Sequence, residues 1–353
     1  MLNRRQLLVV AAGKAALHYA SAIAEERDVT RRTARVPVGG NPEEVEYDVI
    51  GDMRGGMKGR IAGVIFDGLF GTGDKFRHSE VRNAMGDDIV CLALRNNFKQ
   101  KRNVMDSARM AKAVLDADQD FRDSQNIALL GVSAGGLNAL TMTTLLKGRA
   151  KICMLLSAQG DLADPRYARL TPRGDLSRLK TVCANSKGSS LRETALRSAA
   201  MAFIRGMSQD PERMLEQCLQ KLPERDVTLI MNDPELMKLL LEEFAFYCAG
   251  APSGEEGKTL GHLRIENSIR SLFGRGVPWE DIPQETVFSL WHYEEDSLVD
   301  SRNSTLIKKD LEEKSGNRRT EEVHMLPGNS HFGYFEKNGP LPAIVEAMKK
   351  GMR

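Results

Sequence analysis

The sequence has 353 residues, of which 41% are hydrophobic and 28% are charged, close to the averages of soluble globular proteins. This composition excludes a chain disordered throughout, a collagen-like repeat and a protein with many membrane spans. The 50 Lys and Arg residues nearly balance the 48 Asp and Glu residues, giving a net charge of +2, so electrostatics do not favour nucleic acid as a partner.

Residues 1–32 are expected to form an N-terminal helical segment. An Arg-Arg pair at positions 4 and 5 precedes an apolar run, and Ala-Ser-Ala at 20–22 resembles a cleavage site, as in export signals of the twin-arginine type. Lys14 and His18 interrupt the run, which leaves a core of about seven residues, short for a signal and too short to span a membrane. We predict a packing helix and a cytoplasmic protein without stable membrane insertion, with export as the alternative.

The five cysteines give no sign of a disulfide framework or a zinc site. Their number is odd, their spacing is wide and no Cys-x-x-Cys pair occurs. Cys91 and Cys153 lie in apolar runs and are interpreted as buried small hydrophobic residues. This usage favours a reducing compartment.

The first half of the chain alternates strands with helices. Strands are expected at 33–38, 46–51, 61–66, 89–94, 127–130 and 152–156, and helices at 79–85, at 106–118 and in a segment ending near 148. A glycine-rich loop occupies 67–73. Because the apolar character of the central strands is continuous, the pattern predicts a mostly parallel sheet of the α/β class covered on both faces, with right-handed connections.

The pattern changes between residues 161 and 278, which we call the helical insertion. Asp210-Pro211 and Asp233-Pro234 each place a helix-capping residue before a proline, and Leu236, Leu240 and Phe244 recur at helical spacing. Sheet and helix signals then resume at 286–291, 304–314, 323–326 and from 342. The prediction is a core domain made of 33–160 and 279–353, with 161–278 as a helical cap or lid.

The most informative motif is Gly131-Val132-Ser133-Ala134-Gly135, which matches Gly-x-Ser-x-Gly between an apolar strand and a helix. This context is typical of a nucleophile elbow, where a sharp turn exposes the serine hydroxyl above the sheet. The residues two positions away must be small because the strand and helix backbones pass close together there. The alternative is a tight strand–helix turn with an incidental serine.

A nucleophilic serine needs a base, and in elbow-based enzymes the histidine comes last along the chain. His331 follows the segment Leu326–Ser330, a strand end and a Pro-Gly turn, so it can reach the serine. His262, His292 and His324 also follow Ser133 and are weaker candidates.

The acid that orients the histidine is expected after the strand at 286–291. The loop Glu294–Asp300 is rich in carboxylates, and Asp296 directly precedes the apolar pair that anchors the loop to the core. We predict Asp296 as the acid, with Asp300, Glu295 and Asp161 in reserve. At least two of the four carboxylates of the loop are expected to be solvated.

Three segments resemble the catalytic segments of the α/β-hydrolase fold superfamily. They are Val132-Ser133-Ala134-Gly135-Gly136, Glu294-Glu295-Asp296-Ser297-Leu298-Val299 and Leu326-Pro327-Gly328-Asn329-Ser330-His331-Phe332. The resemblance implies Ser133 as nucleophile, Asp296 as triad acid and His331 as base, and it sets the helical insertion in the usual cap position. The chain departs from the usual pattern after the third strand, with Asp67-Gly68 in place of His-Gly, and before the acid, with His292-Tyr293.

The oxyanion hole is expected to combine the backbone N–H of Ala134 with one from the loop after the third strand, where the resemblance points to Leu69. A phosphate-binding role for this loop is disfavoured, since it lacks the lysine of a P-loop. The sequence therefore predicts a serine hydrolase that acts on a small-molecule acyl substrate, an ester first of all, without a cofactor or metal. Amide or peptide hydrolysis, acyl transfer, C–C cleavage and a non-catalytic binding protein are the alternatives.

Overall fold

The computed structural model describes residues 29–38, 41–68, 71–95, 103–170, 210–248, 259–272 and 277–352. The helix expected before residue 25 therefore lies outside the described residues, as does Leu69. The described part of the helical insertion comprises 161–170, 210–248, 259–272 and 277–278.

The core is one eight-stranded sheet, ordered β1-β2-β4-β3-β5-β6-β7-β8. The strands are β1 (Val29–Val38), β2 (Asn41–Ile50), β3 (Ile61–Phe66), β4 (Ile89–Leu94), β5 (Ile127–Val132), β6 (Ala150–Leu156), β7 (Val287–Tyr293) and β8 (His324–Leu326). From β4 to β8 all neighbours pair in parallel, whereas β2 is antiparallel to both β1 and β4. The expected mostly parallel sheet is confirmed, and the short β1–β2 connection permits only antiparallel pairing.

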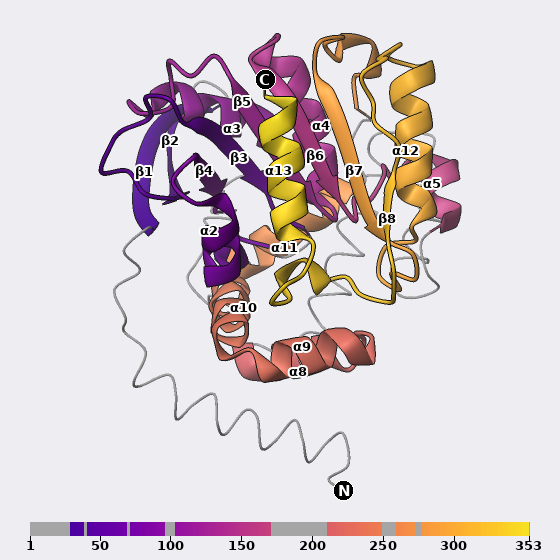
Figure 1. Cartoon of the computed structure of the whole chain (residues 1–353). Coiled ribbons are helices and arrows are strands. Elements are labelled where there is room, and N and C mark those ends of the chain that lie inside the picture. Colours follow the sequence, from indigo (N-terminus) through magenta and orange to yellow (C-terminus); the bar gives the residue numbers. More distant parts are fainter. Residues whose placement is uncertain are drawn as a thin grey trace, which may run out of the picture.

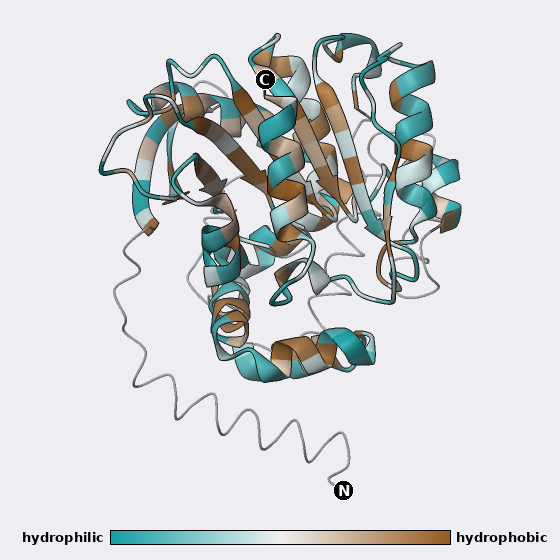
Figure 2. Cartoon of the chain, in the orientation of Figure 1, coloured by the Kyte–Doolittle hydropathy of each residue, from teal (hydrophilic) through white to brown (hydrophobic). Residues whose placement is uncertain are grey.

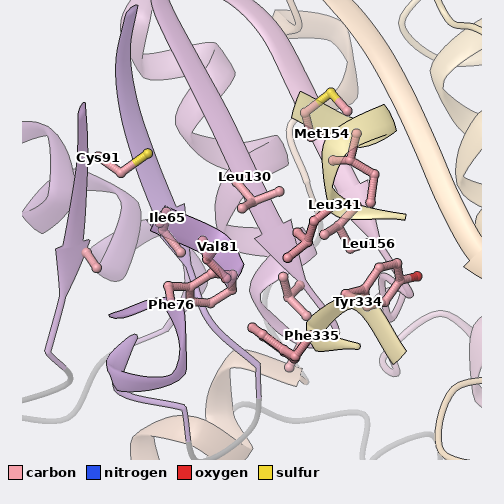
Figure 3. Packing of buried hydrophobic residues seen from close by; sticks show 14 of the residues in the cluster. Ile65, Phe76, Val81, Cys91, Leu130, Met154, Leu156, Tyr334, Phe335 and Leu341 are labelled. Carbon is pink, nitrogen blue, oxygen red and sulfur yellow. The ribbon is translucent and has the colours of Figure 1, made fainter. Parts of the chain in front are cut away.

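Helices cover both faces of the sheet (Figure 1). One face carries α2 (Ser79–Met85) and α13 (Leu341–Gly351), and the other carries α3 (Val104–Ala117), α4 (Gly135–Leu146) and α12 (Arg302–Glu313). Short helices η2 (Trp279–Asp281), η3 (Gly333–Phe335) and α5 (Pro165–Leu170) lie in the connections. Figure 3 shows the packing on the first face, where Leu130 of β5 and Leu156 of β6 lie near Leu341.

Apolar burial explains why the central strands form as they do. Every residue of β5 and of β7 is buried, and Figure 2 shows the central strands as predominantly hydrophobic. Each fully buried leucine or isoleucine contributes roughly 1.5–3 kcal/mol. Cys91 and Cys153 are buried and free, as expected, and burial raises the pKa of Cys91 to about 12.

The described residues of the helical insertion form helices at the edge of the sheet where the parallel strands end (Figure 1). Apart from α5, which packs against α12, they are α8 (Pro211–Leu219), α9 (Glu224–Asn232), α10 (Pro234–Tyr247) and α11 (Leu260–Leu272). The capping signals act as predicted, since the carboxylates of Asp210 and Asp233 accept N–H bonds from the first turns of α8 and α10. Among the described residues no helix is long and apolar enough to cross a membrane.

Candidate active site

Ser133 lies in a sharp turn between β5 and α4. Its φ is 52°, in the left-handed region that side chains rarely adopt. The Ser133 N–H donates to Leu156 O at 2.9 Å, and its carbonyl accepts from Gly136 N–H at 3.1 Å and Gln159 N–H at 2.9 Å. These bonds hold the serine in a conformation that costs on the order of 1–3 kcal/mol.

The glycines around the serine are required by close backbone approach. A Cβ on Gly135 would lie 2.1 Å from the carbonyl oxygen of Phe66, and one on Gly131 would lie 2.8 Å from the Cα of Gly136. A Cβ on Gly68 would lie 2.9 Å from the Cβ of Ser133. The loop that follows β3 therefore begins directly against the serine side chain.

The backbone donors expected of an oxyanion hole fit this arrangement in part. Ala134 precedes the first turn of α4. The N–H groups there have no partner within the helix, and the positive end of the helix dipole lies there. Its N–H makes no hydrogen bond with any described residue. Leu69 lies outside the described residues, but its neighbour Gly68 lies so close to Ser133 that a Cβ on it would clash with the serine side chain.

The structure brings the predicted acid and base together. His331 Nδ1 and Asp296 Oδ2 are 2.7 Å apart, and both side chains are buried. The other oxygen of Asp296 accepts N–H bonds from Leu298 at 2.9 Å and Val299 at 3.0 Å. The carboxylate is therefore fixed by its own loop and holds the histidine ring in one orientation.

Each partner shifts the pKa of the other. Burial alone would raise the pKa of Asp296, but the charge and hydrogen bond of His331 outweigh it and the pKa is lowered. Burial alone would lower the pKa of His331, but the charge and hydrogen bond of Asp296 outweigh it and the pKa is raised. An ionised Asp296 therefore stabilises the imidazolium form of His331.

Ser133 and His331 both lie at the edge where the parallel strands end, after β5 and β8 respectively. No hydrogen bond between described residues joins the serine hydroxyl to the histidine. Such bonds are often long before substrate binds.

The other candidate histidines make different hydrogen bonds. His292 Nδ1 accepts from the Ser304 hydroxyl at 2.7 Å, and its Nε2–H donates to Val299 O at 2.8 Å. Its Nε2 also lies 3.6 Å from Asp296 Oδ2, and burial lowers its pKa. His324 stacks on Trp291 with ring centroids 4.2 Å apart. His262, on α11, lies next to Thr259.

The reserve acids are also occupied elsewhere. Asp300 accepts from Arg302 Nε at 2.9 Å, Glu295 is exposed, and Asp161 accepts from Ala163 N–H at 2.8 Å. Among the described residues no group of three or more His, Cys, Asp or Glu side chains could hold a metal ion.

A buried charge cluster beside the site was not predicted from the sequence. Lys75 Nζ lies 2.7 Å from Asp67 Oδ2, at the start of the loop after β3, and 3.1 Å from Glu243 Oε2 on α10. Asp67 Oδ1 accepts from Gly68 N–H at 2.6 Å, and Oδ2 accepts from Gly73 N–H at 3.0 Å. Asp67 therefore closes this loop on itself and, through Lys75, ties it to α10.

The cluster contains two carboxylates and one ammonium, all nearly inaccessible to water. Burial raises the pKa of Glu243 well above its ordinary value, although Lys75 opposes the shift. Burial alone would lower the pKa of Lys75, but the charges of Asp67 and Glu243 raise it. Lys75 is therefore charged at every physiological pH.

We expect Lys75→Met to destabilise the protein by about 3–5 kcal/mol, because removing one partner of a buried ion pair leaves the other charges uncompensated. Urea unfolding followed by circular dichroism measures this free energy. Lys112→Met is the matched control, since the partly exposed pair of Lys112 with Asp116 contributes less than about 1 kcal/mol. A loss at Lys75 as small as the loss at Lys112 would contradict the importance of the cluster.

Comparison with solved structures finds many similar folds. A membrane phospholipase A described as a bacterial virulence factor is 17% identical with a TM-score of 0.59, covering 98% of this chain and 96% of that one. An α/β-hydrolase fold protein from Nakamurella multipartita is 14% identical with a TM-score of 0.55, covering 91% and 99%. An esterase from Rhodococcus sp. ECU1013 is 15% identical with a TM-score of 0.54, covering 91% and 98%. No protein-family model and no curated protein matches the sequence.

Proposed function

Because this chain has the α/β-hydrolase fold, we propose that it is a serine hydrolase that cleaves a carboxylic ester through an acyl-enzyme on Ser133. One observation carries the proposal. The Asp296–His331 hydrogen bond lies at the same sheet edge as a serine in a strained strand–helix turn. Two of the structural neighbours are esterases, which agrees with this class of reaction.

In the proposed reaction His331 Nε2 takes the proton of the Ser133 hydroxyl while the oxygen attacks the acyl carbon. Asp296 keeps the proton of the ring on Nδ1 and stabilises the imidazolium. The tetrahedral intermediate then collapses, and His331 returns the proton to the leaving alcohol. Water repeats the sequence on the acyl-enzyme, releasing the carboxylic acid and restoring the serine.

The Ala134 N–H and the N–H of Leu69 are proposed to bind the oxyanion. Both act through the backbone, so loop shape matters more than side-chain identity. Each such donor contributes about 10²–10³ in rate. The close approach of Gly68 to Ser133 and the tether from Asp67 to Lys75 support this role for the loop.

We propose that the helical insertion is a lid that selects the acyl chain of a small-molecule substrate. Helix α9 contacts the loop that carries His331, and helix α10 contacts the segment that follows β3. Both helices therefore border the site at the edge of the sheet where the parallel strands end. Substitutions of apolar side chains in this segment should therefore change kcat/KM among acyl lengths while sparing reactivity toward a small activated phosphonate.

A panel of p-nitrophenyl esters with acyl chains of increasing length tests the proposal, together with labelling by a fluorophosphonate probe. Ester hydrolysis and labelling at Ser133 are expected. Labelling without ester turnover would favour amide hydrolysis or acyl transfer on the same residues. Neither labelling nor turnover would favour a non-catalytic binding protein.

We expect kcat/KM to rise with pH through a midpoint above the ordinary histidine value of about 6.5. The base must be neutral, and the pKa of His331 is raised, so the protonated, inactive form persists to higher pH than for a free histidine. Rates with an activated ester over roughly pH 5–9 measure this midpoint. A midpoint at or below that of free histidine would contradict the proposed environment of the ring.

A further inference from the structure

Asp226, on α9 of the helical insertion, is buried with none of its surface exposed. It lies one helical turn from Ile230, the other buried residue of α9. Among the described residues it forms no ion pair with a lysine or arginine. Burying a carboxylate is costly unless hydrogen bonds compensate it, so the partners of Asp226 explain its position.

All of these partners come from the loop that carries the proposed base. Asp226 accepts from the Ser330 hydroxyl, from His331 N–H at 2.8 Å and from Phe332 N–H at 3.1 Å. Donors from three consecutive residues thus converge on one carboxylate, with His331 in the middle. Such converging donors form an anion-binding concavity of the kind that backbone N–H groups build.

His331 is consequently held at two points by two carboxylates from different parts of the chain. Asp296 binds the ring at Nδ1, and Asp226 binds the backbone N–H of the same residue. The first fixes the orientation of the ring and the second fixes the position of the Cα from which the ring projects. Displacing a catalytic group by about 1 Å can cost on the order of 10²-fold in rate.

We propose that Asp226 is a positioning residue that fixes the loop of His331 and stabilises the imidazolium formed in catalysis. This inference rests on the proposed function only for the role of His331 as base. In this proposal the helical insertion borders the site and also fixes the position of the base, His331.

The charges around His331 agree with this role. Asp296 raises the pKa of His331 most, the charge of Asp226 raises it further, and Lys75 opposes them. His292, buried nearby, has a lowered pKa. Removing the charge of Asp226 is therefore expected to lower the pKa of His331. If Asp226 only attached the insertion to the core, its removal would not have this effect.

Asp226→Asn tests the proposal, because asparagine has nearly the same shape but carries no charge and cannot accept all three donors. We expect kcat to fall by about 10- to 100-fold with little change in KM, and the acid limb of kcat/KM to move to lower pH. A variant with wild-type kcat, or with lower kcat but an unmoved acid limb, would overturn the proposal.

Asp210→Asn is the matched control. It makes the same substitution in the same insertion, at an exposed residue that caps α8, and asparagine caps a helix as well as aspartate does. It should leave kcat and the acid limb at wild-type values.

If Asp226→Asn does not fold, Ser330→Ala carries the test by removing one donor. We expect its kcat to fall about threefold or more at unchanged KM, and wild-type kcat would overturn the proposal.

A measurement without substrate separates this inference from the proposed function. NMR titration of the histidine rings follows His331 directly, its signal being the one absent from His331→Gln. A lower His331 pKa in Asp226→Asn than in wild type supports the proposal, whether or not esters are hydrolysed. An equal pKa in the two proteins would overturn it, even if the wild type is an active esterase.

Discussion

Replacing Ser133 by alanine should lower kcat for ester hydrolysis by about 10⁴-fold or more while leaving the fold intact. The proposed triad acts as a unit, so removing the nucleophile removes the benefit of His331 and Asp296 as well. The residual rate would come from the oxyanion donors and from binding. Steady-state kinetics with an activated ester and the loss of fluorophosphonate labelling measure the effect.

Ser157→Ala is the matched control for this substitution. Ser157 also has a left-handed backbone, with φ 43°, and it follows the neighbouring strand β6. Its hydroxyl bonds to the Tyr334 hydroxyl at 2.9 Å and not to the proposed triad. This variant should keep kcat within about tenfold of wild type. A Ser133→Ala enzyme that is equally active would refute the assignment of the nucleophile.

Asp296→Asn is expected to lower kcat by about 10⁴-fold through the tautomer of His331. One carboxylate oxygen accepts from Leu298 N–H and Val299 N–H. An asparagine in this place keeps its carbonyl on those donors and turns its NH₂ group toward His331. The ring must then accept at Nδ1 and carry its proton on Nε2, where it can no longer take one from the serine.

The kinetics of Asp300→Asn and Glu295→Gln provide the comparison. Neither carboxylate contacts His331, because Asp300 pairs with Arg302 and Glu295 is exposed. Both variants should stay within about tenfold of wild type. A large loss at either position with an active Asp296→Asn enzyme would show that another carboxylate orients the base.

Local sequence signals predicted the core well where burial is continuous. The bounds of β3, α2 and β4 agree with the expected ranges 61–66, 79–85 and 89–94. Strand β1 begins four residues before the expected start at residue 33, because Arg31 and Arg32 carry no apolar strand signal. In the fold both charges are paired, Arg31 with Asp48 on the neighbouring strand β2 at 3.0 Å and Arg32 with Asp118 at the end of α3 at 2.9 Å.

The residues of the candidate site also fall into those that local sequence signals indicate and those that only long-range contacts reveal. Ser133, Asp296 and His331 each follow a strand in a turn that the sequence indicates, so spacing along the chain was enough to propose them as a set. Asp226 and Lys75 could not be found, because each acts on a residue more than a hundred positions away. A charged residue on an amphipathic helix ordinarily faces water, and only tertiary packing reveals that Asp226 is buried.

The two carboxylates that the helical insertion contributes limit how this protein could be recombined with others of the same fold. Exchanging residues 161–278 for the corresponding segment of another protein of this fold would remove Asp226 and Glu243 together. Lys75 would then lose a counter-ion, and the donors of Ser330, His331 and Phe332 would lose their acceptor. Viable chimeras should therefore have their crossovers outside α9 and α10, so that both helices stay with the parental core.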